Sequence, residues 1–66
     1  MTWAEALEAL KQGKRVRRAI WFAGLYLKIM PAENSDLELC FFDNGELDFL
    51  CFLAVQDLEA TDWQVY

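Results

Sequence analysis

LELCFFDNGELDFLCF, residues 37–52, is the stretch that decides the fold. Two apolar runs, Leu37–Phe42 and Leu47–Phe52, flank the polar segment Asp43–Glu46, whose centre is Asn44-Gly45. Asn-Gly between apolar runs is the strongest short signal for a β-hairpin, because a type I′ turn needs positive φ at both central residues. The turn sets the register, and the facing pairs we expect are Asp43 with Glu46, Phe42 with Leu47, and Cys40 with Phe49.

Both faces of the predicted hairpin are largely apolar. One face would carry Cys40 and Phe42, and the other would carry Phe41 and Leu50. One face must pack against the rest of the chain, and the other needs a cover, which a second copy or a target protein would supply. Cys40 and Cys51 come out diagonal in this register, so we expect two reduced thiols and no disulfide.

The residues before the hairpin also follow a period of two. Leu25–Met30 is typical of a strand, with its leucines and its isoleucine on one face. Arg15–Arg17 predicts a shorter strand, and Phe22–Gly24 predicts the turn between the two. Pro31 should end the longer strand, and Ala32–Asp36 predicts a polar loop that leads into the hairpin.

At the N-terminus the period changes to that of a helix. Thr2 and Glu5 fit a capping box, in which each side chain accepts a hydrogen bond from the other residue's backbone amide. Apolar residues at positions 3, 6, 7 and 10 form one face, and Gly13 suits a left-handed helix end. We therefore predict a helix over Trp3–Gln12.

The C-terminal residues predict a helical turn, Asp57–Ala60, and a last strand, Trp63–Tyr66. A helix followed by strands is typical of the α+β class. We predict a single domain over residues 1–66, with one N-terminal helix packed on an antiparallel sheet of four to five strands. The apolar stripe of the helix should meet one face of the sheet. The contacts we expect are those of Trp3, Leu7 and Leu10 with Leu27, Ile29 and Trp63.

The composition fits a small folded domain. Sixty-six residues with 56% hydrophobic side chains exclude a disordered chain, although a domain of this size buries only about 60% of its unfolded surface. The surplus of apolar residues favours self-association or a partner, and a homodimer is one such arrangement. No apolar run is long enough to span a bilayer and no signal peptide is recognisable. We therefore expect a cytoplasmic protein without membrane contact.

The sequence argues against an enzyme. Histidine, the commonest general base and metal ligand, is absent. Without it no hydrolase triad or zinc site can be assembled, and there is no Gly-rich phosphate loop. Composition still allows a glycosidase-like carboxylate pair, but so short a chain has little room for a substrate cleft. We expect function through binding, with no catalytic residues, metal or cofactor.

The charges divide between the two halves of the chain. All six basic residues lie within residues 1–28, and residues 29–66 hold nine of the eleven acidic residues. The acidic set along the hairpin and its entry loop could imitate nucleic-acid phosphates, and its members are Glu33, Asp36, Glu38, Asp43, Glu46 and Asp48. The basic run Lys14–Arg18, followed by Trp21, could bind phosphates and stack on a base. A solvated surface is the alternative for each set.

The two ends of the chain resemble a family of small phage proteins. The family opens with an aromatic residue and then E-A-L-x-x-L-K-x-G-K-x-V-x-R-x-x-W, and it closes with D-L-L-A-x-D-W. The matching residues are Trp3-Ala4-Glu5-Ala6-Leu7, Leu10-Lys11-Gln12-Gly13-Lys14, Arg18-Ala19-Ile20-Trp21 and Asp57-Leu58-Glu59-Ala60-Thr61-Asp62-Trp63. The resemblance is to the anti-Thoeris proteins of the second type, formerly a domain of unknown function. It implies sequestration of a cyclic nucleotide immune signal in pockets between subunits.

The chain departs from that family at several positions. Ile20 stands where the family often has Gly before the first Trp, and Cys51-Phe52-Leu53-Ala54 replaces a W-x-P-S segment. The middle insertion is shortened to Pro31–Asp36. These changes remove groups that could stack on a nucleotide or form hydrogen bonds with it, whereas Arg18 and Trp21 persist.

Two hypotheses follow, beside a third possibility in which a structural phage protein merely assembles with itself. In the first, the protein is an anti-CRISPR-type phage inhibitor in the host cytoplasm, which binds the type I surveillance complex (Cascade). Its acidic, DNA-mimicking surface would then block target DNA binding, and its size and acidity resemble those of type I anti-CRISPRs. In the alternative, an oligomeric sponge sequesters a cyclic nucleotide signal, which Arg18 and Trp21 would grip. The first hypothesis expects no direct contact with nucleic acid.

Overall fold

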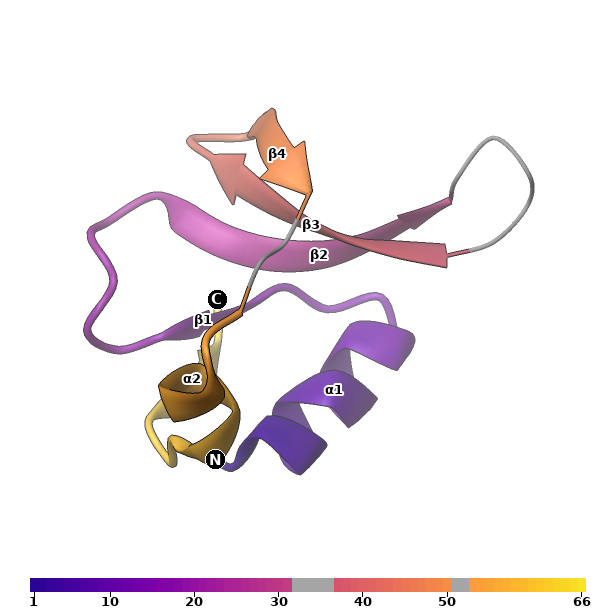
Figure 1. Cartoon of the computed structure of the whole chain (residues 1–66). Coiled ribbons are helices and arrows are strands. Elements are labelled where there is room, and N and C mark those ends of the chain that lie inside the picture. The colour runs from indigo at the N-terminus through magenta and orange to yellow at the C-terminus, as the bar shows by residue number, and fades with distance from the viewer. Residues whose placement is uncertain (32–36, 51–52) are drawn as a thin grey trace.

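One sheet and two helices make up the fold, in a computed structural model that describes residues 1–31, 37–50 and 53–66 (Figure 1). At residues 48–50 only the backbone is described. In chain order the elements are α1 (Trp3–Lys11), β1 (Val16–Arg18), β2 (Leu25–Pro31), β3 (Leu37–Asp43), β4 (Glu46–Leu50), α2 (Val55–Glu59) and β5 (Trp63–Val65). The five strands form an antiparallel sheet in the order β4-β3-β2-β1-β5. The predicted α+β class is confirmed.

The residues at the two ends of α1 explain where the helix begins and stops. Thr2 Oγ1 accepts a hydrogen bond from the Glu5 amide at 3.3 Å, and Glu5 Oε1 accepts one from the Thr2 amide at 2.9 Å. The predicted capping box is therefore present, and its backbone hydrogen bond holds the pKa of Glu5 below the usual value. At the other end Gly13 has a φ of 87°. The amides of Gly13 and Lys14 bond to carbonyls of the last helical turn in a Schellman motif.

The core lies where α1 meets the sheet. Its buried residues come from both helix and strands and are Ala6, Ala9, Leu10, Val16, Leu27, Phe41 and Trp63. Trp3 and Leu7 pack partly buried against this cluster, and the ring centres of Trp3 and Trp63 are 5.0 Å apart. The predicted docking of the helix is confirmed, because its one apolar stripe meets the alternating face of the strands.

The hairpin turn has the predicted conformation, but the strands slip beyond it. Asn44 and Gly45 have φ values of 52° and 88°, and the facing pairs nearest the turn are as expected. The register then shifts, so that Phe41 faces Phe49 and Cys40 faces Leu50. The predicted pairing of Cys40 with Phe49 is wrong, because a β-bulge adds one residue to β4 and displaces every later pair. Cys51, needed to judge the diagonal cysteines, lies outside the described residues.

Both helices lie on the same side of the sheet, and the β3–β4 hairpin extends away from them (Figure 1). Neither α1 nor α2 lies over the opposite side, which we call the open face. Side chains alternate across a strand, so the residues between the core positions point to the open face. These residues are Arg17, Tyr26, Lys28, Met30, Glu38, Cys40, Phe42 and Gln64, with Arg15 and Tyr66 beside the strand ends.

Candidate functional site

Two arginines and two tyrosines gather on the open face, and we call them the Arg–Tyr cluster: Arg15, Arg17, Tyr26 and Tyr66. The guanidinium carbon of Arg15 lies 4.9 Å from the ring centre of Tyr26 and 5.1 Å from that of Tyr66. The guanidinium carbon of Arg17 lies 5.5 Å from the ring centre of Tyr66. The two rings are stacked, with centres 5.3 Å apart. Each cation therefore lies over an aromatic face in cation–π geometry.

The pairing of β1 with β5 builds this cluster. Val16 faces Val65, and the amide of Tyr66 donates to the carbonyl oxygen of Arg15 at 2.9 Å. Because Val16 is buried on the helix side, Arg15 and Arg17 on either side of it point to the open face. The ring of Tyr26 is supported from β3 by the nearly parallel ring of Phe42, at a centre distance of 5.4 Å.

The arginines of the chain fall into two electrostatic classes. Within the described part of the chain, both ion pairs belong to Arg18, which reaches Asp57 at 2.7 Å and Asp62 at 2.8 Å. The hydrogen bond from Arg18 holds the pKa of Asp62 below its usual value, and the hydrogen bond to Asp62 raises the pKa of Arg18. Arg15 and Arg17 instead lie on tyrosine rings. Arg17 also donates from Nε to the carbonyl oxygen of Arg18 at 3.2 Å and from Nη2 to that of Trp21, so most of the in-plane N–H donors that stay available belong to Arg15.

Arg18 and Trp21, the predicted ligand-binding pair, both have partners within the chain. The side chain of Arg18 is only 13% exposed beside its two carboxylates. The ring of Trp21 is half-buried, with its centre 5.3 Å from that of Phe41 and 5.4 Å from that of Trp63. The carbonyl oxygen of Trp21 accepts a hydrogen bond from Arg17. These contacts tie β1 and its following loop to the C-terminal residues. A ligand role for the pair stays a prediction.

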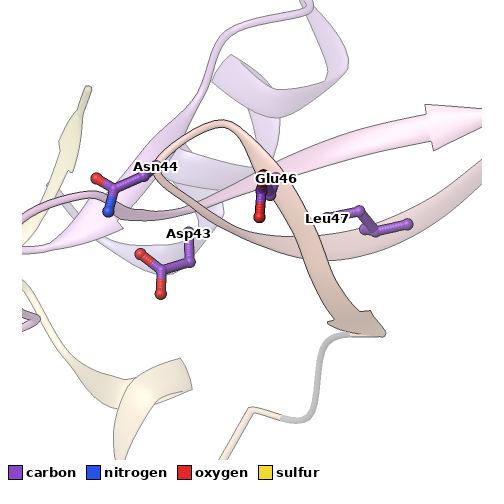
Figure 2. A pocket seen from close by; sticks show the side chains of 4 residues that line it. All are labelled: Asp43, Asn44, Glu46 and Leu47. Atoms are coloured by element: carbon purple, nitrogen blue, oxygen red, sulfur yellow. The ribbon is translucent and has the colours of Figure 1, made fainter.

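The predicted acidic set is only partly gathered. Asp43 and Glu46 face each other beside the hairpin turn and, with Asn44 and Leu47, line an open hollow of about 350 Å³ (Figure 2). Figure 2 shows the side chains of Asn44 and Leu47 pointing to different sides of the turn. Glu38 is paired with Met30 near the other end of β3, about 16 Å away at ~3.3 Å per residue.

The side chains of the three other members of the acidic set lie outside what the structure describes. Glu33 and Asp36 lie outside the described residues, and at Asp48 only the backbone is described.

No group of at least three Cys, Asp or Glu side chains in the described ranges could hold a metal ion. Burial raises the pKa of the Cys40 thiol, which keeps it protonated and unreactive at neutral pH. None of the helices in these ranges is long and apolar enough to cross a membrane.

The basic run Lys14–Arg18 could be predicted as a phosphate-binding segment from the sequence, whereas the tyrosines of the cluster were not predicted. The alternation of Arg15 and Arg17 around an apolar Val16 was the available signal, since it places two cations on the face opposite the core. Tyr66 could not be connected with them, because 51 residues separate it from Arg15. Only the pairing of β5 with β1 brings them together.

Comparison with known proteins assigns the chain to a family. The family model described as Tad2-like, Thoeris anti-defense 2-like domain, matches residues 1–66. A search of the curated proteins found no match. The family match confirms the anti-Thoeris resemblance and a role in anti-defence. It overturns the hypothesis of an anti-CRISPR that binds Cascade through a DNA-mimicking surface: the predicted function, the DNA mimicry and the predicted CRISPR-Cas partner are wrong.

Proposed function

The chain belongs to the Tad2-like (Thoeris anti-defense 2-like) family, and from this we propose that it sequesters a cyclic nucleotide signal of a bacterial immune system. The observation that carries the proposal is the family match, which spans residues 1–66. The ligand would be a small anion with a planar base, bound in the host cytoplasm. The Arg–Tyr cluster supports this ligand class, because guanidinium groups bind phosphates and aromatic rings stack on bases.

Sequestration requires binding alone. A protein that removes a signal must be present in excess over it and bind it more tightly than the immune receptor does. It need not lower any reaction barrier, so a chain without histidine is not at a disadvantage. We therefore propose that the protein is not an enzyme and releases its ligand unchanged.

Calorimetry tests this proposal directly. The purified protein is titrated with a panel of cyclic dinucleotides and cyclic ADP-ribose derivatives, with AMP as a small anionic control. We expect saturable binding of at least one cyclic nucleotide and much weaker binding of AMP. Heating the complex should release the ligand with its original mass and retention time. If no member of the panel gives heat at high concentration, the proposal is wrong. Recovery of a hydrolysed ligand would contradict the non-enzymatic mode of action.

A further inference from the structure

We infer that the anionic ligand binds on the open face of the sheet, at the Arg–Tyr cluster, and not at Arg18 and Trp21. The inference rests on the proposed function and assigns its site. In the arrangement that the geometry favours, Arg15 and Arg17 bind a phosphate and the ring of Tyr66 stacks on a base. The ligand class is therefore a nucleotide that carries both groups close together.

The open face is basic where β1 crosses it. At the open-face positions of β1, β2 and β5 and just before β1, the charged side chains are Arg15, Arg17 and Lys28, all of them basic. The protein as a whole has a net charge of −5, so most of its surface repels an anion. Two arginines therefore gather at β1, with Lys28 on the neighbouring β2, and Glu38 is the acid that β3 places on the same face, opposite Met30.

The side chain of Arg15 is held in place by contacts within the chain. Its guanidinium lies over two rings, and its Nη2 is 3.5 Å from the main-chain oxygen of Tyr66. An arginine held in place has less rotamer entropy to lose when a phosphate binds, which raises affinity. The stacked guanidinium keeps a planar set of donors that suits two oxygens of one phosphate.

The two tyrosines of the cluster differ in how far they are exposed to solvent. Tyr26 is only 6% exposed and is enclosed by Phe42, Tyr66 and Arg15, so it supports the cluster from below. Tyr66 is 44% exposed as a residue, so a base would stack on the part of its ring that Tyr26 and the two guanidinium groups leave uncovered. Stacking on an aromatic side chain tolerates any base, because every base has a π-face. A base on Tyr66 and a phosphate on Arg15 would therefore be recognised separately.

Arg18 differs from the arginines of the cluster because its guanidinium is already paired with two carboxylates. Two carboxylates already bind its Nε and Nη1 at 2.8 and 2.7 Å. A phosphate that approached it would meet Asp57 and Asp62 and would have to displace them. Arg18 therefore stabilises the fold, and its loss should be visible in the melting temperature more than in the affinity for the ligand.

Charge-matched variants test the site. Arg15→Gln and Arg17→Gln are compared with Lys14→Gln, which removes the same charge from an exposed residue next to the cluster. With the cyclic nucleotide that binds the wild type in the calorimetric panel, we expect each arginine variant to raise Kd about tenfold or more. Lys14→Gln should change Kd by less than about threefold. Thermal melts establish that each variant is folded at the temperature of the titration.

Two further variants separate the two recognised groups. Arg15→Lys keeps the charge but loses the planar fork, so it should bind more weakly than the wild type and more tightly than Arg15→Gln. Tyr66→Leu should weaken the binding of the cyclic nucleotide but leave the affinity for inorganic pyrophosphate unchanged. If Arg15→Gln and Arg17→Gln keep the wild-type Kd, the inferred site is wrong, although the proposed function stands.

Sodium pyrophosphate tests the site even if no cyclic nucleotide of the panel binds. In NMR titrations of the wild type with sodium pyrophosphate, we expect saturable shifts of the Nε–H signals of Arg15 and Arg17. Shifts centred on Arg18 and Trp21, or no saturable shift at all, overturn the assignment of the site. A wild type that shows these pyrophosphate shifts but binds no member of the panel keeps the anion site and loses the proposed signal class.

Discussion

Arg18 joins β1 to Asp57 in α2 and to Asp62 just before β5. The amide of Ala19 also donates to the carbonyl oxygen of Asp62 at 3.1 Å, so side chain and backbone hold the same junction. Trp63 follows at once and is buried, with its Nε1 donating to the carbonyl oxygen of Asp57 at 2.9 Å. The ion pairs therefore fix the position of the residue that closes the core.

The lowered pKa of Asp62 predicts a loss of stability in acid. Its pKa in the folded protein lies below the ordinary value of 3.8, because Arg18 donates a hydrogen bond to the carboxylate. The stabilisation is complete above the ordinary pKa and disappears as the pH falls through the folded one. Asp62→Asn should therefore lower Tm at pH 7 and lose less further Tm than the wild type between about pH 5 and pH 2.

Melts followed by far-UV circular dichroism measure this difference. Glu59→Gln is the control, because it removes one negative charge from an exposed residue of the same segment. Its melting temperature should follow that of the wild type at each pH. An Asp62→Asn variant with the same acid dependence as the wild type would show that the ion pair does not stabilise the fold.

Among the elements, α1 contributes most of one side of the core. Ala6 and Leu10 are 0% and 1% exposed, whereas Leu7 is only partly buried and Glu8 is exposed. The helix therefore presents a graded series from the centre of its apolar stripe to its solvent side. Alanine variants along this series therefore test which face of the helix packs against the sheet.

Truncation along α1 should follow burial. Leu10→Ala should cost about 2–5 kcal/mol, which approaches the ~3–5 kcal/mol that the core of so small a domain supplies. We expect Leu10→Ala to be largely unfolded at physiological temperature, Leu7→Ala to be intermediate and Glu8→Ala to melt close to the wild type. Thermal melts followed by tryptophan fluorescence report the order, since Trp3 and Trp63 lie in this junction. Equal melting temperatures for Leu10→Ala and Glu8→Ala would mean that α1 docks on another face.

The whole molecule is held together unevenly. α1 packs against β1, β2 and β5, while β4 pairs only with β3 at the sheet edge farthest from the helices (Figure 1). Val16 and Leu27 at the centre of the sheet are 0% exposed, whereas Leu47 in β4 is 62% exposed. Large apolar side chains are also exposed in the β1–β2 loop, where Ile20 and Phe22 are 71% and 64% exposed. A second copy of the chain could cover these exposed apolar side chains, but self-association stays a prediction.

Hydrogen exchange should reveal this gradient. Regions with few buried contacts open with free energies below that of global unfolding. We expect the amide of Leu27 to exchange only by global unfolding, and the amide of Leu47 to exchange through smaller openings and therefore faster. Exchange measured by NMR at several low denaturant concentrations distinguishes the two. Protection of Leu47 equal to that of Leu27 would mean that the hairpin is covered in solution, as a second copy would do.

The local elements could be predicted from the sequence, because the interactions that form them span few residues. Thr2 and Glu5 cap α1 from three positions apart, and Asn44-Gly45 tolerates the positive φ of the hairpin turn at its own two residues. The helix, the turn and the alternation of β2 were therefore determined by the sequence alone. So was the face of α1 that enters the core, since its period of apolar residues leaves one choice.

Only the tertiary structure decided which charged groups meet. The bulge that shifts β4 against β3 has no turn residue to mark it in the sequence. Arg15, Arg17 and Arg18 are equivalent cations in the sequence, yet strand order brings carboxylates 39 and 44 residues away to Arg18. The same strand order brings Tyr66 to Arg15 and Arg17. The physical reason is that such contacts depend on which strands are neighbours and in which register they pair, and local propensities do not carry strand order.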